Sequence, residues 1–151
     1  ALMDRLFPLA TVVTPNIPEA ELLIGATIAD LAQMRSAAQR IARMGVPNVV
    51  IKGGHLGGGQ AVDVLYDGSG FCELSDERIA TRNTHGTGCT FSSAIAAWLA
   101  RGCPFPEAAQ RAKRYVTGAI ANALAIGKGH GPTHHFYDLY ARAGMTTGCG
   151  P

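Results

Sequence analysis

Two glycines and a thiol lie close together in the stretch Gly86-Thr87-Gly88-Cys89. A long alanine-rich apolar run follows directly, so the stretch is expected to open a helix. Backbone N–H groups at a helix N-terminus, together with the positive end of the helix dipole, favour phosphate or a developing phosphoryl charge. Glycine lets a ligand approach the main chain closely. The pattern predicts an anion-binding loop, although a glycine turn before a helix also serves ordinary packing.

The thiol of Cys89 belongs to the same predicted turn. A helix N-terminus stabilises thiolate relative to thiol. Cys89 is therefore a candidate to accept or transfer a proton near neutral pH, next to the predicted anion site.

Polar side chains also follow two apolar, strand-like runs. Asn16 and Glu19 come after residues 9–14, and Lys52 ends residues 48–52. In a parallel sheet these side chains and the glycine loop would emerge at one edge. A nucleoside triphosphate needs a cation near its phosphates, an amide or carboxylate to hold magnesium, and backbone donors. The alternatives are helix capping for Asn16 and Glu19, and a solvent-exposed strand end for Lys52.

Strand and helix patterns alternate along the chain, which predicts an α/β fold with a largely parallel sheet. Trp98 and Tyr115 are expected in the core. Residues 1–139 form the expected domain, and residues 140–151 are poor in core signals and predict a flexible tail. The expected elements are strands 9–14 and 48–52, a hairpin over 62–74 with its turn at 67–70, and helices 18–23, 31–42, 89–101 and 106–126.

Composition narrows the function classes. The 151 residues are 47% hydrophobic and 16% charged, with a net charge of +2, which indicates one soluble globular domain and argues against nucleic-acid binding. The most apolar window, residues 94–100, is too short to span a membrane.

The histidines and cysteines give no metal or disulfide pattern. His130, His134 and His135 lack helical metal-ligand spacing. Four widely spaced cysteines predict reduced thiols in a cytoplasmic protein: Cys72, Cys89, Cys103 and Cys149.

Four segments together carry a family resemblance: residues 14–21, 51–55, 83–94 and 131–137. They resemble the hydroxymethylpyrimidine/phosphomethylpyrimidine kinases of thiamine biosynthesis, in the ribokinase-like superfamily. The resemblance implies a three-layer α/β/α fold. It corresponds only to the C-terminal part of the family's usual length, somewhat more than half, so the chain is expected to be a partial domain that needs its N-terminal part.

The resemblance implies ATP- and magnesium-dependent phosphorylation of 4-amino-5-hydroxymethyl-2-methylpyrimidine and then of its monophosphate. It implies that Asn16 and Glu19 serve magnesium and phosphate and that Lys52 lies close to the ATP phosphates. Val64 on the hairpin would line the adenine pocket, with core packing as the alternative.

The resemblance also assigns the glycine loop. Gly86, Thr87 and Gly88 match the family's anion hole, while Thr84 and His85 fall beside it on the nucleotide side. His85 would touch a phosphate or shape the loop. Cys89 stands where many members of the superfamily carry an aspartate base, and a cysteine there is normal in the pyrimidine kinase branch.

Two other functions stay open at this point. The chain also resembles the related pyridoxal/pyridoxine kinases, which share the cysteine-bearing loop. A truncated, noncatalytic chain that binds nucleotide or a partner is the third possibility. The resemblance further implies that homodimers are common among relatives, and we expect the isolated chain to have weak or no kinase activity.

Overall fold

The structure is a computed structural model that describes residues 2–54, 59–124, 126 and 128–145. The chain forms two compact units, Ala1–Arg78 and Ile79–Pro151. His55, Cys149 and half of the expected tail lie outside the described residues. Within the described residues, no helix is long and apolar enough to cross a membrane.

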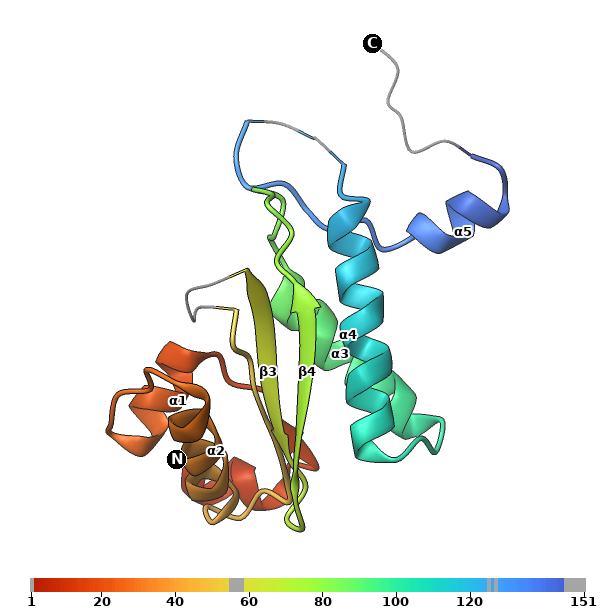
Figure 1. The fold of residues 1–151 in the computed structure, drawn as a ribbon. Helices are drawn as coiled ribbons and strands as arrows, with labels where there is room; N and C mark the ends of the chain where they lie inside the picture. Colours follow the sequence, from red (N-terminus) through yellow and green to blue (C-terminus); the bar gives the residue numbers. More distant parts are fainter. Residues whose placement is uncertain (1, 55–58, 125, 127, 146–151) are drawn as a thin grey trace. The chain divides into compact units, whose positions relative to one another are not determined.

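The first unit consists of two short N-terminal turns, four strands and two helices (Figure 1). In chain order these are a π-helical turn η1 (Leu2–Leu6), a 3-10 turn η2 (Phe7–Leu9), β1 (Val12–Val13), α1 (Ile17–Ile24), α2 (Leu31–Ala42), β2 (Asn48–Ile51), β3 (Gln60–Tyr66) and β4 (Phe71–Glu77).

The four strands form one mixed sheet in the order β1-β2-β3-β4. β1 and β2 pair in parallel, whereas β2–β3 and β3–β4 are antiparallel. The α/β class and the hairpin are confirmed, and in this sheet the expected parallel arrangement holds for β1 and β2. The first strand is shorter than expected because Pro8 lies in the η2 turn, which Ala10 N–H closes on Phe7 O at 3.0 Å.

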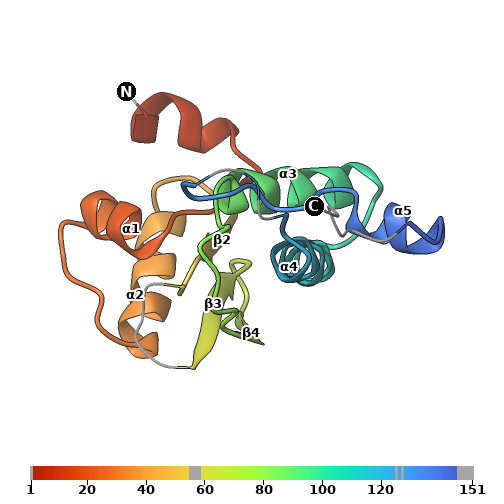
Figure 2. The ribbon, with the colours of Figure 1, turned by 90° about the horizontal axis from the view of Figure 1, so that it is seen from above.

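Local capping explains both helices of this unit. Asn16 caps α1, which ends at Gly25 with φ +65°, and Asp30 caps α2 by accepting a bond from Gln33 N–H at 2.7 Å. Both helices lie on one face of the sheet (Figure 2). The core between them includes Met34 and Ile41, which are completely buried. Burial of such a side chain contributes about 1.5–3 kcal/mol.

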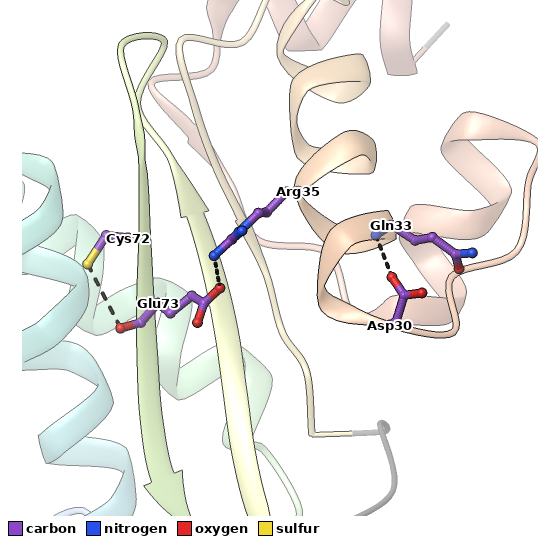
Figure 3. A network of polar contacts seen from close by, with 5 residues as sticks. All are labelled: Asp30, Gln33, Arg35, Cys72 and Glu73. Atoms are coloured by element: carbon purple, nitrogen blue, oxygen red, sulfur yellow. Dashed lines mark hydrogen bonds and ion pairs between the residues drawn. The ribbon is translucent and has the colours of Figure 1, made fainter.

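An ion pair links α2 to the edge strand β4, as Figure 3 shows. Nη2 of Arg35 lies 2.6 Å from Oε1 of Glu73 on β4. Glu73 pairs in register with Val64, so Arg35 reaches over β3 to the outer strand of the hairpin. Both side chains are partly exposed, and such pairs contribute only about 0.2–1 kcal/mol.

The second unit contains three helices: α3 (Thr87–Ala100), α4 (Phe105–Ala121) and α5 (Tyr137–Arg142). α3 packs against α4 (Figure 1), and Ile95 and Ala112 are completely buried. α4 ends earlier than expected, because Asn122 caps it and donates from its side-chain amide to Gly118 O at 2.9 Å. α5 continues past the expected domain boundary after Leu139.

Trp98 and Tyr115 are half-buried, so the expectation of core positions for them is wrong. The Trp98 ring faces two cations: the guanidinium carbons of Arg101 and Arg111 lie 4.8 and 4.6 Å from its centroid. Glu107 in turn holds Arg111, with Oε1 2.7 Å from its Nη2. The cation–π contacts explain why this large aromatic ring lies at the surface.

Candidate functional site

In the first unit the strand pair β1–β2 places Asn16 beside Lys52. The two residues form an isolated parallel bridge beyond the last paired residues of the strands. Lys52 N–H donates to Pro15 O at 2.9 Å, which extends the parallel ladder to the start of α1. The predicted adjacency of Asn16 and Lys52 at a strand end is therefore found, with the lysine half-buried.

Asn16 and Glu19 form a complete capping box. Asn16 Oδ1 accepts from Glu19 N–H at 2.8 Å, and Glu19 Oε2 accepts from Asn16 N–H at 2.7 Å. Asn16 and Glu19 therefore do cap the helix, which was the alternative role that their sequence positions allowed. Glu19 is exposed, and its second oxygen, Oε1, stands outside the box.

These residues fit a role in holding magnesium. Mg²⁺ in nucleotide sites usually takes one or two carboxylates together with phosphate oxygens and several waters. An exposed carboxylate with one oxygen outside the capping box satisfies that pattern. Among the residues that the structure describes, no group of three or more His, Cys, Asp or Glu side chains is placed to hold a metal ion by itself.

Val64 requires a correction. It lies in the core cluster of the first unit with no exposed surface, paired between Ile51 and Glu73. A side chain with no exposed surface cannot contact a bound adenine ring. The packing alternative therefore explains Val64, and we assign it no contact with nucleotide.

In the second unit the glycine loop opens α3 as the sequence predicts. Gly86 precedes the helix with φ +81°, a conformation that favours glycine, and no side chain among the described residues caps the first turn. Thr87 N–H is occupied by Thr84 O at 3.3 Å. The N–H groups of Gly88 and Cys89 lie in the first turn, where no helical acceptor exists. They are the donors that an anion would meet there.

A second segment fixes this loop in place. His85 forms a parallel bridge with Pro132, and His85 N–H donates to Gly131 O at 3.2 Å. In return, Gly131 N–H donates to Asn83 Oδ1 at 3.1 Å. A Cβ on Gly131 would come within 2.4 Å of that oxygen, so the contact requires glycine. These bonds show that the main chain of His85 shapes the loop.

Cys89 is exposed and is the third residue of α3. Its side chain lies at one end of an open groove of about 560 Å³ within the second unit. The groove follows α3 from Cys89 to Arg101, and its other wall includes Tyr115 and His135. The thiol is thus accessible to a bound molecule on the same turn that presents the N–H groups.

The three clustered histidines have separate environments. His130 Nδ1 lies 3.0 Å from Arg82 O, and His134 Nδ1 accepts from Phe136 N–H at 3.3 Å. His134 is buried, with its ring edge-on to Tyr140 at 5.0 Å between centroids, whereas His135 is exposed in the groove. Each of the three histidines thus has its own surroundings within the second unit.

Sequence reasoning missed two polar side chains that bond to main-chain groups next to the candidate residues. Asp63, an acidic residue between the apolar Val62 and Val64, is only 6% exposed, and Asn83 holds the loop through Gly131. The alternation of Val62 and Val64 with a polar residue predicts Asp63 on an exposed face, so the pattern carries no signal for its burial. Asn83 carried no signal either, because its partner lies 48 residues away.

The phosphomethylpyrimidine kinase family matches residues 1–134. The chain is 58% identical over 134 residues to the thiamine biosynthesis bifunctional protein ThiED of Geobacter sulfurreducens, covering 89% of the chain and 27% of that protein. It is 52% identical over 140 residues to the hydroxymethylpyrimidine/phosphomethylpyrimidine kinase of Rhizobium meliloti, covering 91% of the chain and 53% of the relative.

Among solved structures, the ADP complex of Bacillus subtilis pyridoxal kinase superposes with a TM-score of 0.86 and 44% identity, covering 91% of the chain and 52% of that protein. This likeness confirms the ribokinase-like α/β fold. The chain belongs to the phosphomethylpyrimidine kinase family. It spans about half the length of the single-function kinases that it matches.

Proposed function

We propose that the protein containing this chain is an ATP-dependent kinase of hydroxymethylpyrimidine and its monophosphate. Family membership supports this function, since the Rhizobium meliloti relative and several others are named hydroxymethylpyrimidine/phosphomethylpyrimidine kinases. The observation that carries the proposal is the uncapped first turn of α3, which presents the N–H groups of Gly88 and Cys89 and the thiol of Cys89 together.

In this mechanism Cys89 acts as the general base. Its Sγ takes the proton of the substrate hydroxyl, and the hydroxyl oxygen attacks the γ-phosphorus of ATP as the bond to the bridging oxygen of ADP breaks. General-base assistance of this kind supplies about 10²–10⁴-fold in rate. The N–H groups of Gly88 and Cys89 donate to the phosphoryl oxygens, where negative charge increases in the transition state.

We assign nucleotide binding in the first unit to Lys52, whose ammonium group offsets phosphate charge. The ADP complex of the Bacillus subtilis relative supports a nucleotide ligand. Asn16 and Glu19 would hold Mg²⁺, directly or through water. When bound, the ion would neutralise charge on the nucleotide phosphates. In the second unit Thr84 and His85 support the nucleotide side of the loop through their main chain.

Pyridoxal is the second candidate substrate, favoured by the high structural likeness to a pyridoxal kinase. A substrate panel separates the two activities. The natural full-length protein is incubated with ATP, Mg²⁺ and hydroxymethylpyrimidine, its monophosphate or pyridoxal, and ADP release is measured. We expect turnover with both pyrimidines and less with pyridoxal. The opposite preference would transfer the proposal to pyridoxal, and no ADP release with any of the three would refute a kinase.

The isolated 151-residue chain is a separate comparison in the same assay. It spans about half the length of its single-function relatives, and groups that orient the substrate are expected in the remainder. We expect turnover by the chain alone to be weak or absent. Substantial turnover would show that the chain is sufficient for catalysis.

A further inference from the structure

The chain leaves the sheet directly after Lys52, at a point of very close packing. Ile51 pairs with Val64, so the register brings Gly53 opposite Val62. A Cβ built on Gly53 would lie 1.8 Å from Val62 O and 3.2 Å from the terminal methyl of Met34. Only glycine fits between β3 and the α2 side of the core, which fixes where the main chain after Lys52 can run.

A side chain takes over the hydrogen bond that a strand partner would make at this point. Gly53 N–H donates to Oδ1 of Asp63 at 2.9 Å, and the carboxylate comes from the neighbouring strand β3. Both residues are buried, with Asp63 only 6% exposed. A buried carboxylate is costly unless hydrogen bonds compensate it, and bonds to a charged acceptor are stronger than neutral ones.

The same loop has a second anchor. Nη2 of Arg78 donates to Gly54 O at 2.5 Å, and Arg78 N–H donates to Gly59 O at 3.0 Å. Asp63 and Arg78 therefore each hold one of the two glycines that follow Lys52. The lysine itself is held from the other side by its main-chain bond to Pro15 O.

We infer that Asp63 is a positioning residue for Lys52: its buried carboxylate holds the Gly53 peptide and thereby fixes the lysine at the strand end for binding a nucleotide phosphate. This inference rests on the proposed function, in which Lys52 contacts the nucleotide. Asp63 touches neither the nucleotide nor the reacting atoms in this role. In this role it acts through the Lys52–Gly53 peptide group, to which it supplies an acceptor oxygen.

The test compares variants of the natural full-length protein by ATP affinity and by amide hydrogen exchange of Gly53. Asp63→Ala removes the acceptor, whereas Asp63→Asn keeps an oxygen at the same position. Asp67→Ala is the matched control: Asp67 lies in the turn at the far end of the same hairpin and also accepts backbone bonds, from Ser69 N–H at 2.9 Å and Gly70 N–H at 2.8 Å. Lys52→Met tests the proposed function itself.

We expect Asp63→Ala to weaken ATP affinity about tenfold, equivalent to about 1.4 kcal/mol, and to accelerate exchange at Gly53. Asp63→Asn should stay within about threefold of the wild-type affinity. Asp67→Ala should leave ATP affinity unchanged, and any acceleration of Gly53 exchange in it should be no larger than its loss of global stability explains. Rescue by Asn and not by Ala distinguishes positioning from general destabilisation.

Three results would overturn the inference. Wild-type affinity in Asp63→Ala, with weakened binding in Lys52→Met, would refute the role of Asp63 and leave the proposed function intact. Equal losses in Asp63→Ala and Asp67→Ala would show that hairpin stability alone is responsible. Unchanged affinity in Lys52→Met would refute the proposed role of Lys52, and the inference with it.

Discussion

Asn16 and Lys52 lie opposite each other in a parallel bridge, at the point where β1 and β2 end and α1 begins. The amide of Lys52 bonds to Pro15, and the side chain of Asn16 caps the helix. The main chain therefore holds both residues in place. The same arrangement gives Asn16 and Glu19 a structural role, which any test of a magnesium role must separate from binding.

Glu19 offers that separation through two substitutions. Glu19→Gln keeps an oxygen that accepts from Asn16 N–H, so the capping box and thermal stability should be retained, whereas Glu19→Ala should cost about 1 kcal/mol of stability. If the carboxylate holds Mg²⁺, both variants should need about 10–100-fold more Mg²⁺ for half-maximal turnover. Calorimetry and Mg²⁺ titration of turnover measure the two effects. Wild-type Mg²⁺ dependence in Glu19→Gln would leave Glu19 with capping alone.

The thiol of Cys89 gives the sharpest prediction for the chemistry. Cys89→Ala in the natural full-length protein should lower turnover by about 10²-fold or more, while ATP affinity changes little, because a base acts in the transition state and not in nucleotide binding. Cys72→Ala is the control, since Cys72 is also an exposed free thiol and lies on β4. Steady-state kinetics with a separate binding titration decide the matter. Unchanged turnover in Cys89→Ala would exclude the base.

Local signals explain what the sequence predicts well. The capping box of α1, the Asp30 cap of α2 and the turn at residues 67–70 involve side chains that bond within three residues, so short stretches determine them. The Gly86 turn belongs to the same class. These features place the start of α1, the start of α2, the hairpin and the loop before α3.

Contacts between distant segments explain what the sequence leaves out. The bond from Gly53 to Asp63 depends on the register of β2 and β3, and the hold of Asn83 on Gly131 depends on a loop far along the chain. Apolar character at helical spacing predicts Trp98 in the core, yet Arg101 and Arg111 cover it at the surface. Periodicity reports which residues are apolar and does not report which partners reach them.

Replacing Gly118 in α4 by alanine should lower stability in the wild-type protein and raise it when Tyr137 is absent. A Cβ on Gly118 would lie 2.3 Å from Oη and 2.4 Å from Cζ of Tyr137, so Gly118→Ala should destabilise the protein by about 1–3 kcal/mol. In a Tyr137→Ala background the clash is gone, and Gly118→Ala should stabilise by about 0.5–1 kcal/mol because alanine favours the helix. Urea unfolding of the four proteins measures both effects. The same sign in both backgrounds would contradict the contact with Tyr137.

Asp67 at the hairpin turn predicts a dependence of stability on pH. The Ser69 hydroxyl, the Ser69 N–H and the Gly70 N–H bond to its carboxylate and hold the pKa of Asp67 below its ordinary value. A carboxyl group with a lowered pKa in the folded state stabilises the protein above its unfolded pKa, about pH 4, and loses that contribution as the pH falls through the folded pKa. Asp67→Asn keeps an acceptor oxygen but cannot ionise.

The free energy of unfolding of wild type and Asp67→Asn should therefore differ most near neutral pH, with wild type more stable. The difference should narrow as the pH falls below about 4, because the wild-type carboxylate then becomes protonated. Ser69→Ala serves as the companion variant: it removes the hydroxyl bond, which contributes most to the lowered pKa, so the pH-dependent difference should shrink. Urea titrations between about pH 2 and pH 7 measure these differences. A difference that stays constant or widens on acidification would show that the turn does not favour the charged form of Asp67.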